Sequence, residues 1–151
     1  MNAGCTGGPP SPHPWKGDDV YNTTGLGQIV AVRVRSGDEA RFWIQLQNDG
    51  VSPDTVTIDG CSGTRRFVIR SVVVGKHTRP APGATDITAA FRHDAATFDL
   101  AASSAGSHRT FTLDIKARTA VEGISYSCPM TITSSGDPTY QDQVVAKLTT
   151  H

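Results

Sequence analysis

From about residue 28 onward, short runs of the chain carry an apolar side chain at every second position. Consecutive side chains of a β-strand point to opposite faces, so each run predicts a strand with one apolar and one polar face. Several such runs separated by turn residues are typical of two antiparallel sheets packed face to face. The clearest apolar faces are those of Val30, Val32 and Val34, and of Ala40, Phe42, Ile44 and Leu46.

Turn residues set the expected strand boundaries. Clusters such as Asn48-Asp49-Gly50 and Ser135-Gly136-Asp137-Pro138 punctuate the runs. No helix is expected, although 85–90 is a short ambiguous stretch. Pro129 has no N–H to give to a ladder, so its run contains either a bulge or an unpaired side. Strands are expected at about 28–35, 39–48, 53–60, 66–74, 85–90, 96–101, 109–118, 124–134 and 142–150.

The first seventeen residues differ in composition from the rest of the chain. Four prolines and four glycines in residues 1–17 exclude a helix and any central strand. This segment is therefore predicted to be a linker or extended arm, with Trp15 as its one large anchor. The remainder, 18–151, is long enough to form one domain with its own core.

The charge balance argues against two classes of partner. Fourteen basic and fourteen acidic residues cancel, so neither nucleic acid nor an anionic membrane surface is an expected partner. No apolar run approaches the roughly 18 residues of a membrane helix, so no membrane insertion is expected. Residues 1–15 show no signal peptide. Either a signal peptide was removed before this numbering begins, or the sequence is an excised domain, or the protein uses no signal peptide.

Residues that could carry chemistry are scattered. The five histidines form no tight pair of the zinc-site type, so no metal is expected. No nucleophile elbow, phosphate-binding loop or dinucleotide fingerprint is present, so neither catalysis nor a cofactor is expected. Four loop carboxylates were considered for calcium, but they lack the required spacing and are expected to be solvated: Asp54, Asp59, Asp86 and Asp94.

Two apolar side chains fall on the face that alternation assigns to solvent. Trp43 lies between Phe42 and Ile44, which belong to the inward face, and Ile29 is outward in the preceding run. An outward aromatic can be covered by a loop or by the arm, meet another chain, or bind a sugar ring. Trp43, Ile29 and Trp15 are therefore candidate interface residues.

Several motifs taken together resemble an immunoglobulin-like β-sandwich family found, often in tandem, in large bacterial extracellular proteins. The resemblance covers about 19–150. The family implies a structural or binding module without catalytic residues, and it generally lacks both cysteines and such an arm. The motifs are Asp19-Val20-Tyr21-Asn22-Thr23-Thr24-Gly25, Gln45-Leu46-Gln47-Asn48-Asp49-Gly50, Gly83-Ala84-Thr85-Asp86-Ile87-Thr88-Ala89-Ala90 and Ser134-Ser135-Gly136-Asp137-Pro138.

The resemblance also implies a pairing of cysteines. In an immunoglobulin order, 53–60 and 124–134 are antiparallel neighbours, which brings Cys61 near Cys128 at a distance that suits a disulfide. The alternative is two buried, reduced thiols acting as small apolar groups. Cys5, in the arm, is left as a free thiol or as one that pairs with another chain.

The sequence thus predicts an all-β, immunoglobulin-like antiparallel sandwich of about seven to nine strands with an extended N-terminal arm. The expected function is that of a non-enzymatic extracellular or cell-surface module. It would self-associate, or join neighbouring β-sandwich domains, through its arm and strand edges. The alternatives are a carbohydrate-binding or adhesion module, in which Trp43 or Tyr140 lies on an open patch that binds a glycan, and a virion decoration protein.

Overall fold

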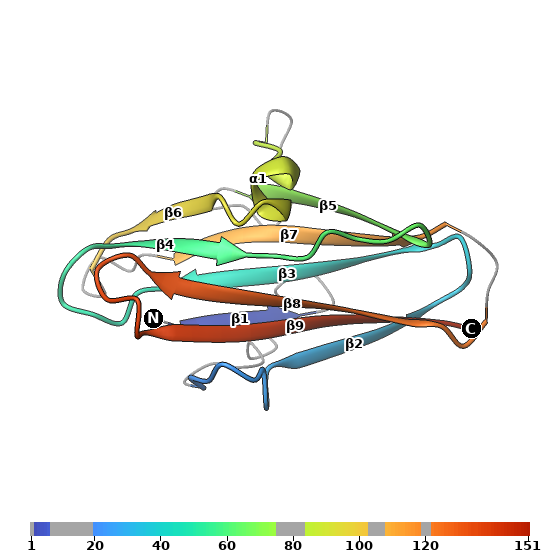
Figure 1. Cartoon of the computed structure of the whole chain (residues 1–151), viewed down its shortest axis with the longest axis horizontal. Helices are drawn as coiled ribbons and strands as arrows, with labels where there is room; N and C mark the ends of the chain where they lie inside the picture. The colour runs from blue at the N-terminus through green and yellow to red at the C-terminus, as the bar shows by residue number, and fades with distance from the viewer. Residues whose placement is uncertain (1, 7–19, 75–83, 103–107, 119–121) are drawn as a thin grey trace.

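The computed structural model describes residues 2–6, 20–74, 84–102, 108–118 and 122–151. Within these residues two sheets pack face to face, and one short helix lies against them (Figure 1). The elements are β1 (Asn2–Thr6), β2 (Ile29–Val34), β3 (Glu39–Gln47), β4 (Asp54–Asp59), β5 (Phe67–Val74), α1 (Thr88–Arg92), β6 (Ala96–Leu100), β7 (His108–Ala117), β8 (Ser125–Ser134) and β9 (Gln141–Thr150).

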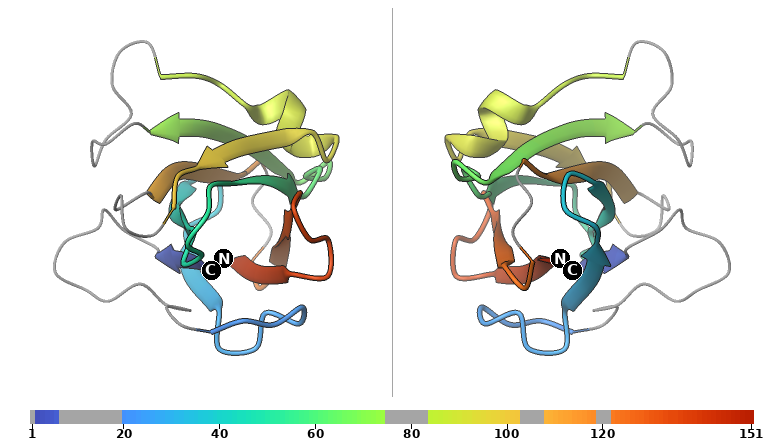
Figure 2. Two further views of the ribbon diagram at one scale, coloured as in Figure 1. Left: turned by 90° about the vertical axis from the view of Figure 1, so that its left-hand side faces the viewer. Right: turned by 90° about the vertical axis from the view of Figure 1, so that its right-hand side faces the viewer.

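The strand order confirms an all-β sandwich. One sheet has the order β1-β3-β7-β5 and the other has the order β2-β9-β8-β4-β6. β4 and β8 are antiparallel neighbours, as the immunoglobulin order requires. The chain changes sheets early, because β1 pairs with β3 in one sheet while β2 runs parallel to β9 in the other. Figure 2 shows the two layers end on.

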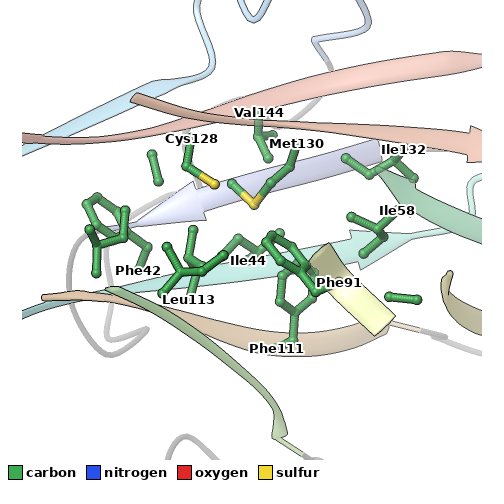
Figure 3. Packing of buried hydrophobic residues seen from close by; sticks show 14 of the residues in the cluster. Phe42, Ile44, Ile58, Phe91, Phe111, Leu113, Cys128, Met130, Ile132 and Val144 are labelled. Atoms are coloured by element: carbon green, nitrogen blue, oxygen red, sulfur yellow. The ribbon is translucent and has the colours of Figure 1, made fainter. Parts of the chain in front are cut away.

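The apolar faces of the strands pack against each other between the two sheets. Phe42 of β3, Phe111 of β7 and Ile132 of β8 are fully buried in one continuous cluster (Figure 3). Phe111 also stacks on Phe98 of β6, with ring centroids 5.7 Å apart, so it joins both sheets at their centre. The period-two pattern therefore identifies the core-facing positions of these strands.

The strand expected at 85–90 is wrong, because this part of the chain forms α1. The Ile87 N–H still donates to the Ser71 carbonyl of β5, and Asp86 accepts a hydrogen bond from the backbone N–H of Thr88, which favours the turn that leads into α1. The Phe91 N–H then donates to the Ile87 carbonyl, which places these two side chains on one side of a helical turn. Phe91 is fully buried, so tertiary packing selects the helical turn that lets its ring reach the core.

The segment 1–17, predicted to be a linker or extended arm, contains a strand. Asn2–Thr6 form β1, an edge strand that pairs antiparallel with residues 43–47, the second half of β3. The exclusion of a central strand stands, since β1 has a neighbour on one side only. The beginning of the chain is thus part of the sandwich, while 7–17 lie outside the described residues.

At Pro129, strand β8 has an unpaired side rather than a bulge. The pairing of β8 with β9 runs without interruption past Pro129, which stands opposite Val145. The pairing of β8 with β4 begins only at Thr131, so Pro129 has no neighbouring strand on that side. The missing N–H is accommodated where the second ladder has not yet started.

The outer edge of β2 gives a testable consequence of this register. The Gln28 carbonyl accepts a hydrogen bond from Val145 of β9, and the Val34 carbonyl accepts one from His151, just after β9. Alternation therefore turns the Val32 backbone toward β9 and the Ala31 backbone away from it. Val32→Pro is expected to lower the free energy of unfolding by about 3 kcal/mol, and Ala31→Pro by about 1 kcal/mol or less. Urea denaturation of both variants measures the difference; equal losses would contradict this assignment of the edge.

Candidate functional site

A broad, open hollow lies at one end of the sandwich. The loop between β3 and β4 and the turn between β8 and β9 meet there, at the left of Figure 1 and facing the viewer in the left panel of Figure 2. Two adjoining depressions occupy this end, with volumes of about 630 and 390 Å³. They share Pro53, Asp54 and Gly136, and we call them together the end groove.

The loop between β3 and β4 is held from within by Asn48. Its Nδ2 donates to the carbonyl oxygens of Ser52, at 2.8 Å, and Ala101, at 3.0 Å, while its Oδ1 accepts from the Gly50 N–H at 2.9 Å. Only 5% of Asn48 is exposed, so these bonds form away from bulk water. Val51, three residues further along the loop, is 94% exposed, so the loop presents an apolar tip on a fixed base.

The turn between β8 and β9 is fixed by Asp137. Its carboxylate accepts hydrogen bonds from the Thr139 hydroxyl, at 2.7 Å, and the Thr139 N–H, at 3.0 Å. These bonds favour the charged form and lower the pKa of Asp137 below its ordinary value. Tyr140 follows, its N–H donating to the Asp137 carbonyl, and its side chain is 66% exposed. An exposed aromatic ring therefore stands on a rigid turn at the rim.

Two charged residues line the wider depression, each on the core-facing side near the start of its strand. Asp54 precedes Val56 in β4, and Arg109 precedes Phe111 in β7, each by two positions. They come from opposite sheets, line the same depression and form no ion pair with each other. Asp99 of β6 lies nearby and accepts a hydrogen bond from the Thr55 hydroxyl at 2.8 Å. The groove thus offers hydrogen-bond acceptors and one guanidinium beside an open aromatic ring.

Trp43 does not belong to the exposed surface, although alternation assigns it to the outer face. It is 3% exposed, and its neighbours on that face are also buried: Thr112 is fully buried and Asp114 is 3% exposed. Trp43 therefore offers no open surface to a sugar or to a second chain. Of its three predicted roles, the one that fits this burial is an aromatic side chain covered by other residues of the same chain. Arg41 binds both carboxylate oxygens of Asp114, at 2.6 and 2.7 Å, beside it.

The other candidate interface residues lie apart from the groove. Ile29 is 40% exposed on β2, the edge strand of the larger sheet. Cys5 lies in β1, opposite Ile44 of β3. Trp15 falls outside the described residues.

The structure forms the disulfide between Cys61 and Cys128, with the Cα atoms 5.3 Å apart. Cys61 lies just past the end of β4, and Cys128 is fully buried in β8 at the far end of the sandwich from the groove. Next to it, the Tyr126 hydroxyl accepts a hydrogen bond from the Gly63 N–H, and the Tyr126 ring stacks on Phe67. Burial is the main cause that raises the pKa of Tyr126 above its ordinary value. These contacts make a packed structural end.

The four loop carboxylates do not converge. Asp59 lies within hydrogen-bond reach of Asp94, which raises the pKa of Asp59 above its ordinary value. Asp86 binds the Arg70 guanidinium, while Asp54 lies at the end groove. Over the residues that the structure describes, no three histidine, cysteine or acidic side chains gather as metal ligands do.

Sequence reasoning named Tyr140 but missed the groove around it. One sequence pattern could have indicated the groove: near the start of their strands, Asp54 and Arg109 are charged residues at positions where alternation predicts an apolar, core-facing side chain. Nothing in the alternation itself says that these two strand ends face each other.

No helix within the described ranges has the length and apolarity needed to cross a bilayer. No protein-family model matches the chain, and no curated protein matches it. Among solved structures, a family 123 glycoside hydrolase from Clostridium perfringens is similar with a TM-score of 0.48 and 11% identity over 82% of this chain. The VesB protease of Vibrio cholerae gives 0.43 and 13% over 82%, and a PapD-like domain of human CEP192 gives 0.38 and 10% over 82%.

The chain spans 23% of the glycoside hydrolase, 30% of the protease and 80% of the PapD-like domain. These likenesses are too distant to place the chain in a family. Its fold is assigned from its own strand order, as a two-sheet β-sandwich.

Proposed function

We propose that this protein is a non-enzymatic extracellular structural module that associates with copies of itself by exchanging its first strand. The observation that carries the proposal is the position of β1. It lies at a sheet edge and pairs with β3 alone among the described strands. The disulfide between Cys61 and Cys128 is compatible with an oxidising, extracellular setting.

Strand exchange conserves the contacts that a single copy already makes. If β1 of one copy pairs with β3 of another, the backbone hydrogen bonds from Asn2 opposite Gln47 to Thr6 opposite Trp43 form again between the two chains. The enthalpy of the ladder is then unchanged, and association opposes the exchange mainly through lost translational and rotational freedom. When each copy gives its strand forward and accepts one behind, the contact is head-to-tail and produces a chain of subunits.

A second sheet edge supports growth by association. β2 turns the backbone groups of every second residue away from β9, and Ile29 is exposed beside them. By contrast, the edge at β5 is partly closed, because the Val73 N–H donates to the Thr85 carbonyl and the Ile87 N–H donates to the Ser71 carbonyl. Open edges of this kind accept an added strand.

Mixed cross-linking tests the exchange directly. One variant carries Asn2→Cys and the other carries Gln47→Cys with a mass tag, both in a Cys5→Ser background, and the two are refolded together with the Cys61–Cys128 bridge intact. Asn2 stands opposite Gln47, so a disulfide between the variants forms only when β1 of one chain pairs with β3 of the other. We expect a tagged heterodimer on a non-reducing gel.

The matched control replaces Gln47→Cys by Thr97→Cys, an exposed position in the other sheet. It should give at most the background of random cross-links. Equal yields from the two pairs, or a mixture that stays monomeric, would refute strand exchange.

A further inference from the structure

The end groove is not needed for strand exchange, and its chemistry points to a ligand. It joins two depressions of about 630 and 390 Å³ and is open along its length rather than enclosed. Tyr140 and Val51 stand exposed at its rim, by 66% and 94%. Exposed apolar side chains on turns that are fixed from within are typical of a binding surface rather than of a loose loop.

The charges around the groove narrow the class of ligand. Three carboxylates line it, those of Asp54, Asp99 and Asp137, against the single guanidinium of Arg109. This excess of negative charge opposes phosphate, nucleic acid and acidic polymers. Small apolar molecules bind in pockets that cover most of the ligand surface, and the end groove is too open to enclose one in this way.

A neutral polyhydroxylated chain satisfies both conditions. The hydroxyl groups of a sugar donate to carboxylates and accept from a guanidinium, while the C–H face of its ring is apolar and packs on an aromatic ring. Asp54 and Arg109 lie in one depression, and Tyr140 lines the other, which Asp54 and Gly136 connect to the first. The groove therefore has room for more than one sugar unit, with Tyr140 in one depression, Arg109 in the other and Asp54 where the two meet.

We propose that the end groove binds a neutral oligosaccharide or polysaccharide, with Tyr140 stacking on a sugar ring and Asp54 and Arg109 binding its hydroxyl groups. Tyr140 is 66% exposed, so the face of its ring is open to a ligand, and stacking on a sugar requires that face rather than the hydroxyl. Asp54 Oδ1 accepts from the Gly136 N–H at 3.4 Å, which leaves its other lone pairs open to a ligand.

Native affinity electrophoresis of the full chain tests the site. The gels contain hydroxyethylcellulose, galactomannan, xylan, laminarin or soluble starch, with polygalacturonate as the anionic comparison. At least one neutral polymer should retard the protein, and Tyr140→Ala should weaken that binding by about tenfold or more. Tyr140→Phe should retain it. Asp54→Asn, which keeps an oxygen for Gly136, should weaken it several-fold because an amide oxygen is a poorer acceptor than a carboxylate.

Leu26→Ala is the matched control, since Leu26 is an exposed apolar residue outside the groove. It should bind as the unchanged protein does, and circular dichroism should show that every variant is folded. Retardation by none of the five neutral polymers, by polygalacturonate alone, or equally before and after Tyr140→Ala would overturn the proposal. Success or failure here is independent of the cross-linking outcome, because Asn2 and Gln47 lie outside the residues that line the groove.

Discussion

Replacing Cys61 and Cys128 together by alanine is expected to lower the free energy of unfolding by about 4 kcal/mol. The bridge joins residues separated by 67 positions, so it removes much of the freedom of the unfolded chain. Alanine is chosen because Cys128 is fully buried, and a serine hydroxyl there would add a cost of its own. This loss is a large part of the free energy of unfolding of a typical domain, which is about 5–15 kcal/mol.

Urea denaturation followed by circular dichroism measures the loss. The unchanged protein in reducing agent should unfold at nearly the same urea concentration as the double variant, since both lack the same constraint. Cys5→Ser under oxidising conditions is the control and should leave the midpoint in place, because Cys5 is outside the bridge. A double variant as stable as the unchanged protein would show that the bridge does not constrain the unfolded chain.

Trp43→Ala is the second variant with a large expected effect. Trp43 is 3% exposed although it points away from the core between the sheets, so the change removes a large buried ring and leaves a space behind. Substitutions of this kind typically lower the free energy of unfolding by about 3–5 kcal/mol. A tryptophan on an open surface would give a change within about 0.5 kcal/mol.

Circular dichroism follows unfolding here, because the substitution removes much of the fluorescence signal. Trp43→Phe should restore part of the loss, since it fills most of the volume. Tyr140→Ala is the comparison for an exposed aromatic and should leave the free energy of unfolding within about 0.5 kcal/mol. A similar small change for Trp43→Ala would show that the outer face of β3 is open.

The alternation of side chains predicted the strands and their core-facing positions because a sandwich buries one face of each sheet. Phe42, Ile44 and Leu46 are fully buried as that pattern requires. The same pattern was wrong about exposure on the other face. It assigns a direction to Trp43, and whether anything lies over that direction depends on segments far away in the sequence.

Local signals also failed where tertiary contacts decided the conformation. Thr85 and Thr88 favour a strand, but the turn at Asp86 and the burial of Phe91 produce α1 instead. The end groove could not be predicted for a related reason. Asp54 and Arg109 lie far apart in the sequence, and only the packing of β4 and β7 in opposite sheets places them in one hollow.

The last strand has a consequence for how the protein is made. β9 lies between β2 and β8, so β2 has no neighbour in the larger sheet until Gln141–Thr150 are present. During synthesis, Ile29–Val34 must therefore wait without their partner until the segment 141–150 has left the ribosome. Until then the partly buried side chains of β2 lack the neighbouring strand that holds them against the core.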